Sequence, residues 1–145
     1  MLALCAATFV LPLAAEGNSV RLGVSARIAA FFRLQVDHQL DRLTITAQDI
    51  QRGYVDLPAA SQITITTNAA DGYVIEFHSQ SDLFQETRIT GLQDRIVIGP
   101  LGGMAEQSRP HGRNTTHQLS YRFQLRRDLA AGVYAWPLAI SVRSL

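Results

Sequence analysis

The chain has 145 residues, of which 47% are hydrophobic, and it carries a formal net charge of +1. This length predicts a single domain that buries about two-thirds of its unfolded surface, without help from a metal or a disulfide. The hydrophobic content argues against intrinsic disorder, and the small net charge gives no reason to expect nucleic acid or an anionic membrane as a partner.

Residues 1–15, MLALCAATFVLPLAA, are predicted to be a signal peptide that precedes one domain at residues 16–145. The run has no charged side chain, is too short to cross a bilayer and ends in small residues. Cleavage would remove Cys5, the only cysteine, and would leave no disulfide, no thiolate metal site and no stable membrane insertion. The alternative is a buried N-terminal helix or strand.

Residues 20–36, VRLGVSARIAAFFRLQV, alternate between apolar even positions and mostly polar odd positions. Fully extended, the run would measure roughly 56 Å, whereas a strand of a small sandwich is about 17–20 Å long. Two interpretations are open. In the favoured one the chain bends near Ala29 and Ala30 and forms two strands; in the other, the first half leaves the domain as an arm for strand exchange. The residues of such an arm are Val20, Leu22, Val24, Ala26 and Ile28.

The same alternation recurs at residues 42–47, 62–67, 72–79, 117–127 and 133–142. It is typical of antiparallel strands with one face on the core and the other in water. Turn residues at 67–73 and 128–134 are interpreted as hairpin connections, and Pro137 as a sign of an edge strand or a bulge. Together these features predict an all-β, immunoglobulin-like antiparallel sandwich of about 7–10 strands, with a small β-barrel as the alternative.

Residues 99–116, GPLGGMAEQSRPHGRNTT, are predicted to form one long polar loop. Loops of this length are uncommon unless they are functional, and binding residues often lie on loops carried by a rigid scaffold. The candidate binding residues of this loop are Arg109, His111 and Arg113. With the arginines of the next strand they could form a charged patch, although a solvated strand face is the simpler interpretation. The strand arginines in question are Arg122, Arg126 and Arg127.

Motifs for nucleophilic catalysis, phosphate binding or zinc binding are missing from the sequence. The four histidines have no ligand spacing, and the aspartates between residues 37 and 56 border expected turns, where aspartate caps the backbone. We therefore predict a protein that is not an enzyme and holds no metal or cofactor. The histidines and aspartates considered are His38, His78, His111, His117, Asp37, Asp41, Asp49 and Asp56.

Four stretches carry a resemblance to a known group: VSARIAAFFRLQV, YVDLPAASQITITTN, GYVIEF and DLAAGVYAWPLAISV. In these stretches the chain resembles spore coat protein U-like proteins and archaic chaperone–usher pilin subunits, which are small exported bacterial β-sandwich proteins. Members of the group typically end in a strand introduced by a turn like the one at Gly132 and Tyr134.

The resemblance implies a non-catalytic structural or adhesive subunit of the bacterial envelope or of a surface fibre. Such a subunit lies in the periplasm or at the cell surface and assembles with other protein subunits by exchange of a β-strand. The alternative expectation is a periplasmic module that binds a ligand or a protein through residues 99–116.

Overall fold

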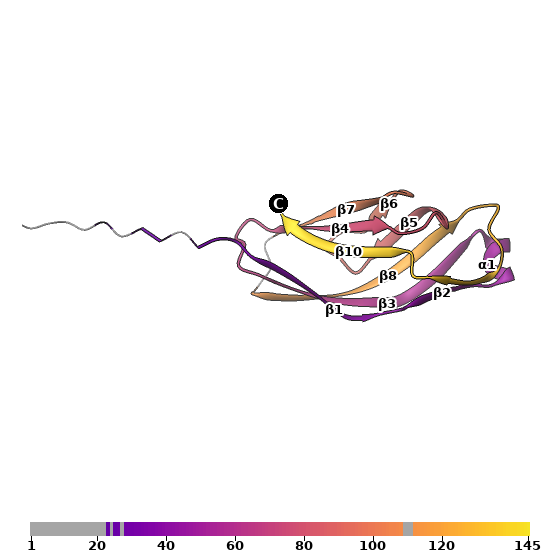
Figure 1. Ribbon diagram of the computed structural model, residues 1–145, viewed down its shortest axis with the longest axis horizontal. Coiled ribbons are helices and arrows are strands. Elements are labelled where there is room, and N and C mark those ends of the chain that lie inside the picture. The colour runs from indigo at the N-terminus through magenta and orange to yellow at the C-terminus, as the bar shows by residue number, and fades with distance from the viewer. Residues whose placement is uncertain (1–22, 24, 27, 109–111) are drawn as a thin grey trace, which may run out of the picture.

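The computed structural model describes residues 23, 25–26, 28–108 and 112–145 (Figure 1). No helix in these ranges is long and apolar enough to cross a membrane. The predicted signal peptide lies outside the described residues. The same holds for five of the candidate site residues, namely Val20, Leu22, Val24, Arg109 and His111.

The described residues form ten strands and one short helix. In chain order these elements are β1 (Phe32–Gln39), β2 (Arg42–Ile45), α1 (Ala47–Arg52), β3 (Tyr54–Thr67), β4 (Tyr73–Ser79), β5 (Phe84–Thr90), β6 (Ile96–Ile98), β7 (Gly102–Gln107), β8 (Asn114–Leu125), β9 (Gly132–Ala135) and β10 (Leu138–Ser144).

The strands make three antiparallel sheets, with the orders β1-β3-β8-β5-β6, β10-β4-β7 and β2-β9. Strands β1, β3 and β8 run along one side of the molecule, and β10, β4 and β7 run along the other (Figure 1). The predicted all-β antiparallel sandwich is confirmed, and the sheets do not close into the alternative barrel.

Alternate side chains of the strands fill the space between the two larger sheets. Ile63 and Ile65 of β3 are fully buried, as are Ile75 and Phe77 of β4, in the phase that the sequence predicts. An aromatic cluster extends this core, because the Trp136 ring meets the neighbouring β8 rings edge-on at centroid distances of 5.3 and 5.9 Å. Burial of such side chains supplies most of the stabilisation of the fold.

Both predicted hairpins are wrong, because the two segments cross between sheets. Residues 67–73 lead from β3 in the five-stranded sheet to β4 in the three-stranded sheet, and residues 128–134 lead from β8 to β9, which pairs with β2. Turn residues specify that the chain changes direction, but they do not specify the strand with which it pairs next. At the first crossing only glycine fits, since a Cβ on Gly72 would lie 2.3 Å from the Gln107 carbonyl oxygen.

The predicted closing strand at 133–142 is split in two at Trp136 and Pro137. The first part, β9, pairs with β2, whereas β10 pairs with β4. The Trp136 N–H donates to the Asp41 carbonyl at 3.0 Å, and Pro137, which has no N–H, follows it. Proline therefore marks the point at which the chain changes sheets, and β10 is an edge strand.

The prediction of one long loop at residues 99–116 is also wrong. Gly102–Gln107 form β7, which pairs with β4, and β8 already begins at Asn114. The strand is difficult to recognise because it opens with two glycines, which have low strand propensity. Glycine is required here by close packing, since a Cβ on Gly103 would lie 2.6 Å from Ile98 Cγ2.

Candidate functional site

The described residues immediately before β1, 28–31, extend away from the sandwich (Figure 1). Residues 28–31 belong to no strand, and the side chain of Asn68 fixes their last part: it accepts from the Phe31 N–H at 2.8 Å and donates to the Ala29 carbonyl at 3.1 Å. Ala26 is exposed, and Ile28 is 85% exposed. None of the described residues 23, 25–26 and 28–31 lies in a strand, and most of the first strand that the favoured interpretation expects lies outside the described residues. Donation of the arm to a neighbour stays a prediction.

An open seam runs along one side of the sandwich, between the edge strands β1 and β10. The two strands lie close together but share no hydrogen-bonded ladder in the part of the chain that the structure describes. At one end the seam is closed, because β2 follows β1, β9 precedes β10, and β2 pairs with β9. Away from that end, each edge keeps a row of backbone groups that have no strand partner among the described residues, and such a row is a template for an added strand.

Apolar side chains line this seam and are only half-buried. Phe32 and Leu34 of β1 and Ile140 and Val142 of β10 pack against the core from its margin, and Val36 is 47% exposed. The inward residues of the central strands β3, β4 and β8 are, in contrast, almost completely buried. The seam is therefore the part of the core that the domain itself covers least.

The arm and the seam match in pattern and in length. The arm residues at 20–28 place an apolar side chain at every second position. Nine extended residues span about 30 Å, whereas the eight residues of β1 span about 26 Å and the seven residues of β10 about 23 Å. A strand made from residues 20–28 is therefore long enough to cover either edge from end to end.

Two arginines of the possible charged patch, Arg113 and Arg126, lie far apart. Arg113 is exposed just before β8, whereas Arg126 follows the other end of that strand, and a strand of 12 residues is about 40 Å long. The backbone of Arg113 has a structural contact, since its carbonyl accepts the Thr67 N–H at 2.9 Å.

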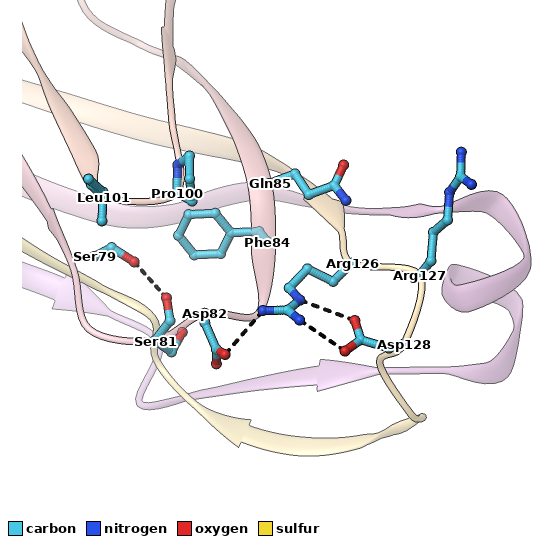
Figure 2. A pocket seen from close by; sticks show the side chains of 10 residues that line it. All are labelled: Ser79, Ser81, Asp82, Phe84, Gln85, Pro100, Leu101, Arg126, Arg127 and Asp128. Carbon is cyan, nitrogen blue, oxygen red and sulfur yellow. Dashed lines mark hydrogen bonds and ion pairs between the residues drawn. The ribbon is translucent and has the colours of Figure 1, made fainter.

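Arg126 instead borders an open groove of about 800 Å³ at the far end of β8 (Figure 2). Its guanidinium lies between two carboxylates, with donor distances of 2.9 and 3.1 Å to Asp128 and 3.2 Å to Asp82. The hydrogen bonds from Arg126 lower the pKa of the Asp128 carboxyl. Arg127 points away from the other lining side chains (Figure 2). The groove therefore has a neutralised arginine at its edge, which agrees with the simpler interpretation of a solvated surface.

His117 is a buried residue that the sequence interpretation missed. Its ring lies between the sheets, with Nε2 3.0 Å from the Tyr73 hydroxyl and Nδ1 3.3 Å from the Gly91 carbonyl. Burial lowers the pKa of the imidazole. The alternation of the strand could have predicted this burial, because His117 lies on the same face as the inward residues Leu119 and Tyr121.

Among residues 23, 25–26, 28–108 and 112–145, no three His, Cys, Asp or Glu side chains converge on a position that could hold a metal ion. Comparison of the chain with protein families, characterised proteins and solved structures found no match.

Proposed function

We propose that this protein is an exported, non-catalytic structural or adhesive subunit of the bacterial envelope, which assembles by exchange of a β-strand. The observation that supports this proposal most is the coexistence, in one domain, of the exposed residues Ala26 and Ile28 before β1 and an open apolar seam between β1 and β10. The resemblance of the sequence to pilin-like subunits and its signal-like N-terminus point in the same direction.

In the proposed assembly, the arm of one copy pairs with the free edge of β1 or β10 of the next copy. Backbone hydrogen bonds supply much of the affinity, while the alternate apolar side chains of the arm cover Phe32, Leu34, Ile140 and Val142. Because a donor surface meets a different acceptor surface, the contact is head-to-tail and produces rings or open fibres.

The test compares residues 16–145 with the variants Val24→Asp and Ser25→Asp, by light scattering coupled to size exclusion over a range of concentrations. Both variants add one negative charge to the arm, but only Val24 occupies the apolar phase. We expect the parent protein to form assemblies, Ser25→Asp to retain them and Val24→Asp to lose them. A parent protein that stays monomeric at every concentration would contradict the proposal, as would equal behaviour of the two variants.

The alternative is a periplasmic binding module that uses residues 99–116. Because Gly102–Gln107 belong to β7, this alternative depends on the connection at 108–113, which carries Arg109, His111 and Arg113. Replacing these three side chains by alanine would abolish capture of a ligand or partner if this alternative holds. The same replacement would leave assembly through the arm intact.

A further inference from the structure

Strand β3 contains an irregularity that its role in the sheet does not explain. Leu57 pairs with Tyr121 and Ser61 pairs with Leu119, so three residues of β3 lie opposite Ser120 alone. Within this bulge Ala59 has a φ of 50°, and it is the one non-glycine residue in the described part of the chain with a positive φ. That conformation is unfavourable for any residue with a Cβ.

A specific contact holds the bulge in place. The Ala59 N–H donates to Ser120 Oγ at 2.9 Å, across the outer face of the five-stranded sheet. Bulges are often found beside functional sites, because they redirect side chains and separate neighbouring strands, and strained residues cluster at such sites. The surface around this bulge is therefore a candidate functional site.

A cavity of about 400 Å³ opens at this bulge, a size that suits a small molecule. Its walls combine the apolar side chains of the bulge with polar side chains from β3, β5 and β8 and from the connection between β5 and β6, and the core residue Tyr121 also contributes to the lining. The lining residues are Asp56, Leu57, Pro58, Arg88, Thr90, Arg95, Ser120, Tyr121 and Arg122.

The charge of this cavity is unbalanced, with three arginines against Asp56 alone. Arg88 and Arg122 are direct cross-strand partners, an arrangement of like charges that weakens a sheet. Arg122 donates through Nε and Nη2 to Asp56 at 2.6 and 2.9 Å, and Arg88 donates through Nε to Glu86 at 3.1 Å. Arg95 has no ion pair within the described residues. Donor groups of all three guanidinium ions thus stay available.

We propose that this cavity binds a small molecule through a carboxylate or phosphate group. Arg88, Arg95 and Arg122 would donate to the oxygen atoms of that group, since guanidinium binds planar or tetrahedral oxyanions through paired N–H donors. The Ser120 hydroxyl accepts from the Ala59 N–H, and its own proton remains free to donate to the ligand. The Tyr54 ring orients one donor, because the Arg122 guanidinium lies 4.6 Å from its centroid.

This site is independent of the proposed strand exchange, because it lies on the face of the sheet between β3, β8 and β5, away from the seam. It also differs from the groove at Arg126, where two carboxylates neutralise the single bound guanidinium. Two kinds of ligand group could supply the bound oxygen atoms: a phosphate, or a carboxylate such as that of an acidic sugar. The experiment below distinguishes the two.

The experiment follows backbone amide shifts of residues 16–145 during titration with glucuronate and, separately, with inorganic phosphate at constant ionic strength. We expect saturable shifts centred on Ala59, Ser120 and Arg95 with at least one probe, and the probe that saturates identifies the ligand group. Arg95→Gln should weaken this binding about tenfold, which corresponds to about 1.4 kcal/mol. Arg88→Gln should weaken it to a similar extent.

Arg127→Gln is the matched control, since it removes the same charge from a side chain outside this cavity. The affinity of the Arg127→Gln variant for the saturating probe should equal that of the parent protein. The melting temperature of Arg95→Gln should be unchanged, because Arg95 lies outside the strands. Shifts that rise without saturation for both probes would overturn the proposal. Equal loss of affinity in Arg95→Gln and Arg127→Gln would also overturn it, because the attraction would then be unspecific.

Discussion

Tyr73→Phe removes one buried oxygen atom and tests the polar link between the two larger sheets. Tyr73 lies in β4 and is 1% exposed, and its hydroxyl is 3.0 Å from Nε2 of His117 in β8. Because the Gly91 carbonyl can only accept, Nδ1 of the neutral His117 ring carries the proton. Nε2 is then an acceptor, and the Tyr73 hydroxyl donates to it.

The substitution leaves Nε2 of His117 buried without a donor. A buried polar atom that loses its partner costs about 1–3 kcal/mol, and we expect the free energy of unfolding to fall by that amount. Tyr134→Phe is the matched control, since its hydroxyl donates to the Ala130 carbonyl at an exposed position and its loss should cost less than about 0.5 kcal/mol. The measurement is urea unfolding at about pH 7.5, followed by circular dichroism. Equal stability of the two variants would refute the assigned hydrogen bond.

The same buried ring predicts how stability depends on pH. Burial lowers the pKa of His117 below its usual value of 6.5, so the unfolded chain binds a proton more readily than the folded protein does. The contribution of the buried, neutral His117 ring to the free energy of unfolding is therefore complete above pH 6.5. It is lost as the pH falls towards the pKa of this ring in the folded protein. His117→Gln should abolish this loss between pH 6.5 and 5. If the parent and variant curves are parallel in that window, the imidazole is not held neutral by burial.

Three further substitutions test local features of the fold. Asp49→Ala should cost about 1 kcal/mol in urea unfolding, because the Asp49 carboxylate accepts from the Thr46 N–H and completes the capping box of α1; a neutral effect would contradict that role. Gly102→Ala should lower stability by at least about 2 kcal/mol, since Gly102 has a φ of 106° and a new Cβ would lie 2.0 Å from the Phe77 carbonyl oxygen. Gly99→Ala, where nothing lies within 4 Å of the new Cβ, should leave the melting temperature nearly unchanged. Similar melting temperatures for these two glycine variants would contradict the packing at β7.

The phase of the strands could be read from the sequence because it is a local property. Successive side chains of a strand point to opposite faces, so the pattern at Ile63 and Ile65 predicts burial without reference to any partner strand. The same reasoning, applied to the first residue of the segment 117–127, would have placed His117 in the core, because His117 lies two residues before the inward Leu119. Helix α1 has a readable signal as well, since Thr46 and Asp49 form a capping box and Gly53 ends the helix.

The pairing of the strands could not be read in this way, because it depends on contacts between distant residues. Residues 67–73 carry the turn chemistry of a hairpin, yet the chain crosses to the other sheet. Strand β7 is specified less by its own residues than by the β4 backbone beside it, which leaves room only for glycine at Gly102. The cavity at Ala59 also depends on contacts between distant residues, because the bulge is defined by the register of β3 against β8.

The two proposed sites can operate together, because they use different parts of the sandwich. A strand added at the seam would lie beside β1 or β10, whereas the arginine cavity lies on the outer face of β3, β8 and β5. Assembly through the arm would therefore leave the cavity open, and a fibre would display one copy of it on every subunit. Weak oxyanion binding at a single cavity would then become strong attachment to a surface with many such groups, because linked sites bind with a high effective concentration. The proposed division between an edge for assembly and a face for binding would give a physical basis for the proposed adhesive role.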